Sequence, residues 1–317
     1  MLRYILRRLI STIPSLVVIT SCIFVIGQYG SGDLAAYLTT QQNGGRIDPQ
    51  MYVMYRQRLH LDEPVYIRYG EWLGGALHGD LGVSYVTAGQ PGVKYLIGQA
   101  LPISLEIGFA ALVLVILVGI PLGIVAALFR NTPLDYAIVG AATIFSSVPL
   151  FVLAPLAVYF LVIQIHLVPS VGLGWHGIFS QQSILPVAIL AANSCLTTVR
   201  FTRASVLEVL GQEYVRAAYA KGLSGWKVVV RHVLKNALTP VLSVVGLTAS
   251  YLIGGSLFLE IVFNFQGFGM LTYTSLQGGD LQTITGVVFV IAVLIILINL
   301  LTDILYSLVD PRVKLQA

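Results

Sequence analysis

Five stretches without a charged side chain most constrain what this chain can fold into. They are Leu9–Gly32, Ile107–Phe129, Tyr136–Val199, Asn236–Leu259 and Leu281–Thr302. About 20 helical residues cross the roughly 30 Å apolar core of a bilayer, so four stretches hold one span each. Tyr136–Val199 is long enough for two, with a turn near Pro169, Gly172, Gly174 and Gly177. With 56% hydrophobic and only 10% charged residues, the sequence predicts an all-α integral membrane protein with six transmembrane helices.

The expected spans leave one long segment, 30–98, on the side of the membrane opposite the termini. Asp48 before Pro49 and Glu63 before Pro64 are helix-start signals, and they predict short helices over Pro49–Leu59 and Val65–Leu77. The remaining spans are expected over Pro102–Phe129, Leu134–Gln164, Ile184–Arg203, Leu238–Leu259 and Thr283–Leu308. The whole chain is therefore expected to be one transmembrane domain: first span 1–29, external helical segment 30–98, five-helix core 99–308 and cytoplasmic tail 309–317.

Local sequence within the spans predicts how two of them pack and bend. Gly119 and Gly123 lie four residues apart, a spacing that lets helices approach closely. Pro121 between them is expected to kink the second span, and Pro149 the third. Cys22 and Cys195 both fall inside expected spans, where we expect packing residues rather than a disulfide.

The distribution of cations predicts that both termini are cytoplasmic. The termini and alternate loops carry Arg3, Arg7, Arg8, Arg130, Arg312, Lys314 and the basic segment Arg200–Asn236. On the opposite side every Lys and Arg belongs to the long 30–98 segment, and the loops around Gly172 and Gln266 have none. The net charge of +4 therefore reflects membrane topology, and nucleic acid is not expected as a partner.

The segment Arg200–Asn236 carries seven of the 18 Lys and Arg residues. Each cation placed at mid-bilayer costs roughly 3 kcal/mol, so the segment stays in water, within a cytoplasmic loop over 204–237. A short helix is expected over Glu213–Lys221, ended by a left-handed Gly222, and Ser224 is placed to cap the next helix. From there apolar residues recur at helical spacing: Trp226, Val229, Val230, Val233, Leu234 and Ala237. The loop either docks a partner or rests on lipid headgroups.

Arg216-Ala-Ala-Tyr-Ala-Lys-Gly222, with Asn236-Ala-Leu-Thr-Pro240 downstream, resembles the cytoplasmic "EAA" loop of ABC importer permeases. More narrowly, the chain is similar to the dipeptide/oligopeptide/nickel permease family almost from end to end. Further matching motifs are Leu2–Leu9, Gly79–Gly82, Ile120–Gly123, Glu260–Phe263 with Gly267 and Gly269 after it, and Asp310–Arg312. The loop departs from its name in having Arg216 where a Glu is usual, a substitution that peptide-type members often carry.

The resemblance implies a permease subunit in the cytoplasmic (inner) membrane of a prokaryote, forming half of a pathway for peptides or a related small solute. It implies a second homologous permease, two ATPase subunits and an extracytoplasmic substrate-binding protein as partners. The implied contacts to the ATPase are Glu213, Tyr214, Arg216, Ala217, Ala218, Tyr219, Lys221 and Gly222. ATP and Mg would bind the partner ATPases, because this chain has no Gly-Lys dipeptide and hence no P-loop.

Polar residues within the expected spans are candidates for lining the pathway. They are Ser146, Ser147, Asn193, Thr197 and Glu260. The alternative for the hydroxyls is a bond to their own helix backbone, whereas a mid-span amide such as Asn193 needs a partner. Glu260, like Glu106 and Asp303, lies near the end of a span, where capping or an interface contact is the alternative.

Neither a cofactor site, a metal site nor an enzyme active site is expected in this chain. His60, His78 and His232 are isolated in sequence, and His166 and His176 in one loop do not make a metal site.

Two other functions remain open at this point. A self-contained secondary carrier or channel would need inverted repeats or a central ion site, and a membrane scaffold would share the loop but not the other motifs. Nickel- and oligosaccharide-specific members of the same importer family also remain open.

Overall fold

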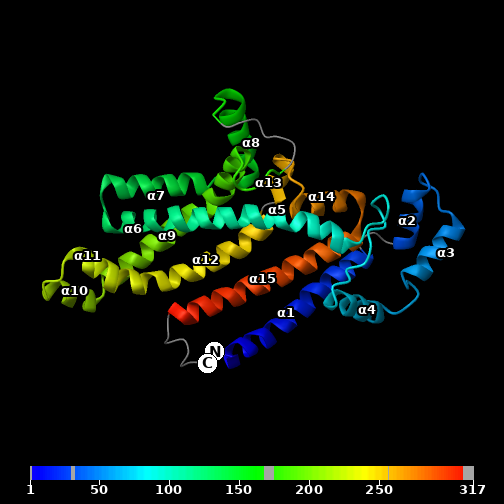
Figure 1. The fold of residues 1–317 in the computed structure, drawn as a ribbon, viewed down its shortest axis with the longest axis horizontal. Helices are drawn as coiled ribbons and strands as arrows, with labels where there is room; N and C mark the ends of the chain where they lie inside the picture. Colours follow the sequence, from blue (N-terminus) through cyan, green and yellow to red (C-terminus); the bar gives the residue numbers. More distant parts are fainter. Residues whose placement is uncertain (1, 30–32, 168–174, 256, 310–317) are drawn as a thin grey trace. The chain divides into compact units, whose positions relative to one another are not determined.

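The computed structural model describes residues 2–29, 33–167, 175–255 and 257–309, and most of these residues are helical (Figure 1). The helices are α1 Leu2–Tyr29, α2 Leu34–Gln42, α3 Pro49–Arg58, α4 Val65–Leu77, α5 Val93–Leu114, α6 Ile120–Leu128, α7 Pro133–Ser146, α8 Leu150–Ala157, α9 Ile184–Leu210, α10 Glu213–Ala220, α11 Gly225–Val228, α12 Lys235–Gly255, α13 Leu257–Val262, α14 Phe268–Gly278 and α15 Leu281–Val309. Three π-helical segments continue helices: Val115–Gly119, Val158–Gln164 and Val229–Leu234. Pro169, Gly172, Gly174 and the Asp310–Arg312 motif lie outside the described residues.

Within the described residues, five helical stretches are long and apolar enough to cross a membrane. They are Ile10–Gly27, Val93–Leu128, Gln181–Leu210, Gly225–Leu252 and Leu281–Leu305. A sixth span results if Pro133–Ser146 and Leu150–Gln164 are taken together, and these two parts meet at an angle of 100°. The all-α membrane architecture is thus confirmed, with five or six spans. Pro149 lies at the bend, as predicted, but the break is sharper than a kink because Pro149 begins a new helix.

Several span boundaries were predicted wrongly. The second span begins at Val93 rather than Pro102, and the fourth continues to Leu210, beyond Arg203. The fifth begins at Gly225 rather than Leu238, because the amphipathic helix runs into it without a break. Helices α2 and α14 were not predicted.

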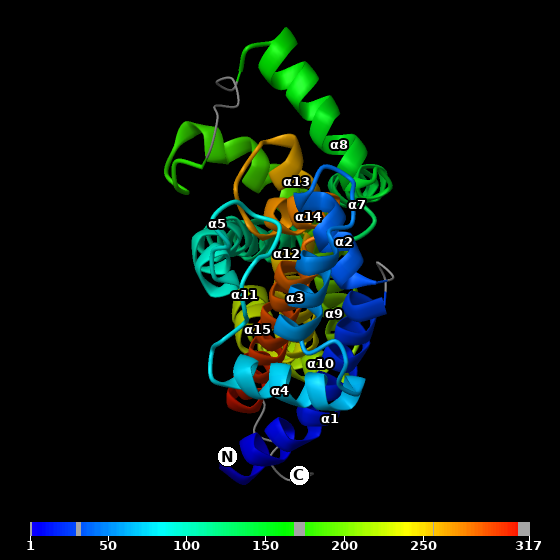
Figure 2. The same cartoon turned by 90° about the vertical axis from the view of Figure 1, so that its right-hand side faces the viewer.

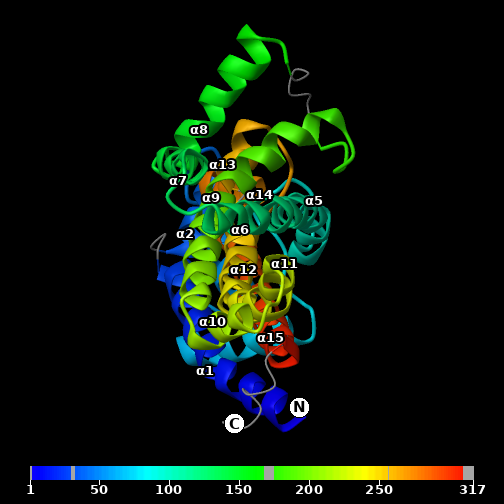
Figure 3. The same cartoon turned by 90° about the vertical axis from the view of Figure 1, so that its left-hand side faces the viewer.

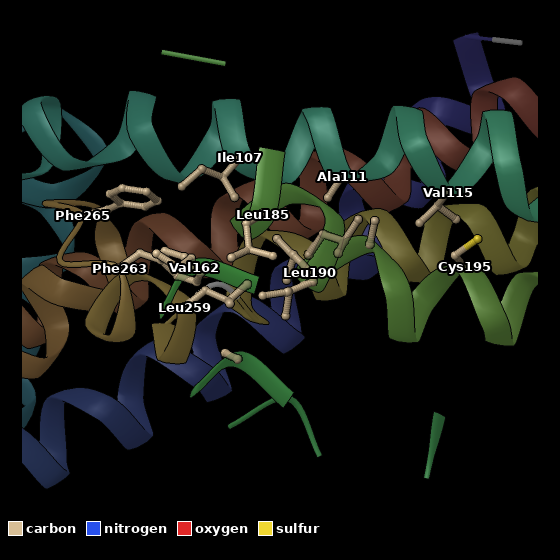
Figure 4. Packing of buried hydrophobic residues seen from close by; sticks show 14 residues of the cluster. Ile107, Ala111, Val115, Val162, Leu185, Leu190, Cys195, Leu259, Phe263 and Phe265 are labelled. Carbon is tan, nitrogen blue, oxygen red and sulfur yellow. The ribbon is translucent and has the colours of Figure 1, made fainter. Parts of the chain in front are cut away.

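The chain forms two compact units, and we describe each separately. The first comprises residues 1–5, 103–265 and 297–317, and its core is drawn in Figure 4. Ile107, Ala111 and Val115 recur every four residues on one face of the second span and pack in one cluster with Leu185 and Leu190 of α9. Cys195 belongs to the same cluster, as expected of a packing residue, whereas Cys22 is exposed; both thiols are free.

Close approach of α6 to α9 in the first unit rests on Gly119 and Gly123, as predicted. A Cβ atom on Gly123 would lie 2.6 Å from the Cβ of Thr202 and 2.7 Å from the carbonyl oxygen of Val199. The kink expected at Pro121 remains a prediction, and the π-helical segment Val115–Gly119 ends two residues before this proline. Because proline has no N–H to donate, the wider turn accommodates its ring without a clash.

Replacing Gly123 with alanine is therefore expected to destabilise the protein by about 1–3 kcal/mol, since the added methyl group meets a backbone carbonyl that cannot rotate away. The matched control is Gly140→Ala on α7, where nothing lies within 4 Å of the added methyl group. That change should be neutral or slightly stabilising, because alanine favours helix. Thermal unfolding of the purified chain in detergent measures both, and equal midpoints would contradict the close-packing account.

The second unit comprises residues 6–102 and 266–296 and contains the segment between α1 and α5 (Figure 2). Helices α3 and α4 have nearly the predicted bounds, and the Asp48 carboxylate caps α3 by accepting from the Gln50 N–H at 2.8 Å. Asp33 caps α2 in the same way, and the hydrogen bond from the Tyr52 hydroxyl holds the pKa of Asp33 below its ordinary value. The predicted cap at Asp48 is therefore confirmed, whereas Glu63 does not cap α4, whose N-cap position is Pro64 and has no side-chain hydrogen bond.

Aromatic and polar contacts hold α4 and the loop after it within the second unit. The Trp72 ring lies 5.7 Å from the rings of both Phe24 and Phe289. The buried Asp280 carboxylate accepts a hydrogen bond from the Ser84 hydroxyl at 2.6 Å, which ties the loop after α4 to the start of α15. The segment after the first span is therefore packed structure rather than a loose loop.

Candidate functional site

The predicted coupling loop is shorter than expected, because helices continue from both sides. Helix α9 ends at Leu210 and α11 begins at Gly225, so only 211–224 lies between them, and it contains α10 (Figure 3). The predicted helix Glu213–Lys221 is observed as Glu213–Ala220, with Lys221 as its C-cap. The loop is thus one short helix held between two long ones.

One face of α10 is anchored in the protein by two residues three positions apart. Val215 and Ala218 are 1% and 6% exposed and belong to a cluster with Val206 of α9 and Val228 of α11. The same cluster contains Ala127, Val233 and Ala237. Ala218, which the resemblance placed among the contacts to a partner, is therefore turned inward. The other seven candidate residues are exposed: Glu213, Tyr214, Arg216, Ala217, Tyr219, Lys221 and Gly222.

Gly222 ends α10 as predicted, with a left-handed φ of +81°. The Gly222 N–H donates to the Tyr219 carbonyl at 2.9 Å, and the Leu223 N–H donates to the Ala218 carbonyl at 3.4 Å. These two bonds form a Schellman motif, which satisfies carbonyls that the helix end leaves unpaired. No atom lies within 4 Å of a Cβ built on Gly222, so the backbone conformation alone requires glycine here.

A side-chain bond provides a second tie that the sequence did not reveal. The Asn236 amide of α12 donates to the Tyr214 hydroxyl at 2.9 Å and to the His232 carbonyl at 3.0 Å. Ser224 does occupy the N-cap position of α11, but its side chain makes no capping hydrogen bond, contrary to expectation. Helix α10 is therefore joined to α12 through Tyr214 and Asn236.

The basic helix that follows α10 differs from its predicted pattern. Val229, Val233 and Ala237 are buried as expected, but Trp226 is 74% exposed and Val230 44% exposed. The helix changes to a π-helical segment only at Val229–Leu234, after Trp226, so this change of helix type does not explain why Trp226 is exposed. The cations Lys227, Arg231 and Lys235 are exposed.

A buried ion pair beside the loop was not predicted. Arg203 of α9 donates from Nε to one oxygen of Asp135 and from a terminal nitrogen to the other, both at 2.7 Å. Asp135 lies in the first turn of α7 and also accepts from the Asn131 N–H at 3.0 Å. The side chains of Arg203 and Asp135 are 25% and 2% exposed. Arg203 was counted among loop cations, whereas it fixes the start of α7 against α9.

Comparison with known proteins identifies the family to which this chain belongs. Residues 119–315 match the family model described as binding-protein-dependent transport system inner membrane component. Residues 1–100 match the model of the N-terminal region of the same membrane components. The chain belongs to this family. It is a translocation subunit of an ABC importer, a multi-pass permease of the inner membrane.

Relatives and solved structures agree with this assignment. The permease is 35% identical to a probable peptide ABC transporter permease protein of Sinorhizobium fredii, over 98% of this chain and 99% of that one. It is 33% identical to a glutathione transport system permease protein of Escherichia coli O6:H1, over 99% of both chains. Its fold resembles the inward-facing MetNI methionine ABC transporter with a TM-score of 0.57 and 20% identity, over 68% of this chain and 97% of that one.

The candidate pathway residues of the permease mostly satisfy their own helices. The Ser147 hydroxyl donates to the Thr143 carbonyl at 2.8 Å, and Ser146 bonds the same carbonyl at 3.1 Å. Thr197 donates to the Asn193 carbonyl at 3.2 Å, and the Asn193 side chain is half-buried. A role for these residues in the pathway remains a prediction.

Glu260 of the permease is not an interface residue, because it is completely buried in α13. Its carboxylate accepts a hydrogen bond from the Ser104 hydroxyl of α5 at 2.6 Å. Glu106, two residues further along α5, accepts from the Trp175 indole N–H at 2.7 Å. The sequence singled out Glu260 but gave no sign of Ser104, which lies 156 residues earlier in the chain.

Proposed function

We propose that this permease moves peptides, or a peptide-like solute such as glutathione, into the cell. The similarity in sequence to a peptide permease and to a glutathione permease over nearly the whole chain supports this substrate class. In the proposed assembly the chain pairs with a second homologous permease, two ATPase subunits and an extracytoplasmic binding protein. Both termini and α10 then face the cytoplasm, in keeping with the excess of cations on that side.

The observation that supports the mechanism is that α10 has one buried face and one exposed face. Val215 and Ala218 fasten it into a cluster shared with α9, α11 and α12, while the opposite face is exposed. A rigid helix fixed in this way passes a displacement on to α9 and to the helix 225–255. We infer that an ATPase binds the exposed face and moves α10 when ATP drives the closure of the two ATPases.

Energy for transport comes from the partners in this proposal. The chain contributes no P-loop, so ATP and Mg bind the ATPase subunits, and the permease itself catalyses no reaction. Movement of α9 and α12 alternates access to the pathway between the two sides of the membrane. Solute released by the binding protein then enters from outside and leaves toward the cytoplasm.

Reconstitution tests this proposal. The purified permease, its homologous partner, the ATPases and the binding protein in proteoliposomes should take up labelled dipeptide or glutathione only when ATP is enclosed with the ATPases. A hydrolysis-deficient ATPase is the control and should abolish uptake. Uptake by the permease alone would favour a secondary carrier. ATP-driven uptake of nickel complexes or oligosaccharides without peptides would contradict the substrate class but not the importer mechanism.

A further inference from the structure

Three potential metal ligands lie close together at the turn between α3 and α4. The proposed coupling mechanism does not involve these residues. They are His60, Glu63 and Glu71, and one ligand atom from each lies within 4.8 Å of the other two. The Nδ1 atom of His60 lies 3.0 Å from Oε1 of Glu63. In sequence His60 looked isolated because Glu71 is on the next helix; the structure corrects that interpretation.

The backbone holds this turn in one conformation. His60 adopts a left-handed φ of 51°, which is uncommon for a residue with a side chain. The Leu61 N–H donates to the Arg56 carbonyl and the Glu63 N–H to the His60 carbonyl, both at 3.0 Å. His60 and Glu63 are thus presented by a closed turn rather than by a loose connection.

Glu71 is positioned independently, by the packing of α4. Its neighbour Trp72 lies against Phe24 and Phe289, and the Tyr69 hydroxyl shares a hydrogen bond with Thr20 at 2.8 Å. These contacts fix the face of α4 from which Glu71 reaches the turn. The three donors therefore come from two separately anchored elements.

The donor set suits a divalent transition metal. One imidazole nitrogen with two carboxylates matches the ligands of zinc, and two negative charges balance a doubly charged ion. Zinc bonds of about 2.0–2.2 Å place tetrahedral ligands about 3.3–3.6 Å apart. Ligand atoms that all lie within 4.8 Å of one another need to approach by little more than about 1 Å to take up these positions. Magnesium and calcium are poorer matches because they favour oxygen-only sites.

A cavity beside the cluster supplies room for further coordination. It has a volume of about 180 Å³, and both His60 and Glu71 line it. Its other lining residues include Arg58, Arg68, Trp72 and Asp280. Three protein ligands leave a fourth position open, and this cavity admits the water that would fill it.

We propose that the α3–α4 turn binds one zinc ion through His60, Glu63 and Glu71, with water in the fourth position. The ion links the turn to α4 and so fastens the segment between the first two spans. The competing explanation is a plain ion pair between His60 and Glu63, in which Glu71 takes no part.

Zinc binding to the full-length, tag-free permease, stripped with chelator and kept in detergent, distinguishes the two. We expect one equivalent of zinc with micromolar or tighter affinity, measured by competition with a chromophoric chelator at fixed pH. His60→Ala and Glu71→Gln should each weaken binding at least about ten-fold. X-ray absorption of the zinc-loaded protein should show one imidazole and otherwise oxygen ligands.

His78→Ala is the matched control, because His78 lies on the same segment and bonds the Gly74 carbonyl through Nδ1 at 2.8 Å. This variant should bind zinc as the unaltered protein does. Near-equal affinity of Glu71→Gln and the unaltered protein would overturn the proposal, as would the absence of micromolar binding. Glu71→Gln keeps the shape of the side chain, so its result does not depend on how well His60→Ala folds; unchanged far-UV circular dichroism confirms folding.

Discussion

Valine in place of Gly222 is expected to reduce ATP-driven uptake at least about ten-fold while the chain still enters the membrane. The reason is the backbone, since φ is +81° and a β-branched residue there costs about 1–3 kcal/mol. Each 1.4 kcal/mol changes a population ten-fold, so the Schellman turn gives way and α10 loses its fixed orientation. Uptake into proteoliposomes and the ATPase rate, measured on the same preparation, separate lost coupling from lost hydrolysis.

Two further variants show whether conformation or side-chain bulk is responsible. Gly225→Ala is the matched control, because Gly225 begins α11 three residues after Gly222, has no left-handed φ and has nothing within 4 Å of an added methyl group. It should transport normally. Gly222→Asn should lose less activity than Gly222→Val, because asparagine tolerates the left-handed region. Normal uptake by Gly222→Val would refute the lever role of α10.

The successes of sequence reasoning share a physical cause, which is that each rests on a local signal. Uncharged stretches longer than a bilayer is thick indicate spans whatever their neighbours are. Asp48 before Pro49 predicted the start of α3 because the cap forms within three residues. Gly222 was recognised for the same reason, since a helix followed by glycine is itself the signal for a left-handed cap.

The failures come from interactions between distant residues or from changes of helix type. The fourth span was predicted to end at Arg203, yet α9 continues to Leu210, and Arg203 pairs with Asp135, which lies 68 residues earlier in the chain. No local pattern marks the π-helical segment Val229–Leu234, and the helical spacing of apolar residues wrongly placed the exposed Trp226 on the buried face. The inward orientation of Ala218 and the meeting of His60 with Glu71 likewise depend on tertiary packing.

The ion pair between Asp135 and Arg203 leads to the second large effect. Replacing Arg203 with glutamine should lower the free energy of unfolding by about 3 kcal/mol, because the buried Asp135 carboxylate loses both guanidinium hydrogen bonds and keeps the one from the Asn131 N–H. Asp135→Asn should cost less, since Arg203 is a quarter exposed and reaches water. The midpoint of thermal unfolding in detergent, with the partner subunits absent, reports both changes.

Lysine at position 203 should give an intermediate value, because an ammonium group keeps the charge but cannot form the two parallel bonds of a guanidinium. The double variant Asp135→Asn with Arg203→Gln should recover part of the loss from Arg203→Gln alone, as expected when two side chains interact directly. Arg231→Gln is the matched control, since Arg231 is exposed and its loss should change stability by less than about 0.5 kcal/mol. If Arg203→Gln were no more destabilising than Arg231→Gln, the pair would not be what holds the start of α7 against α9.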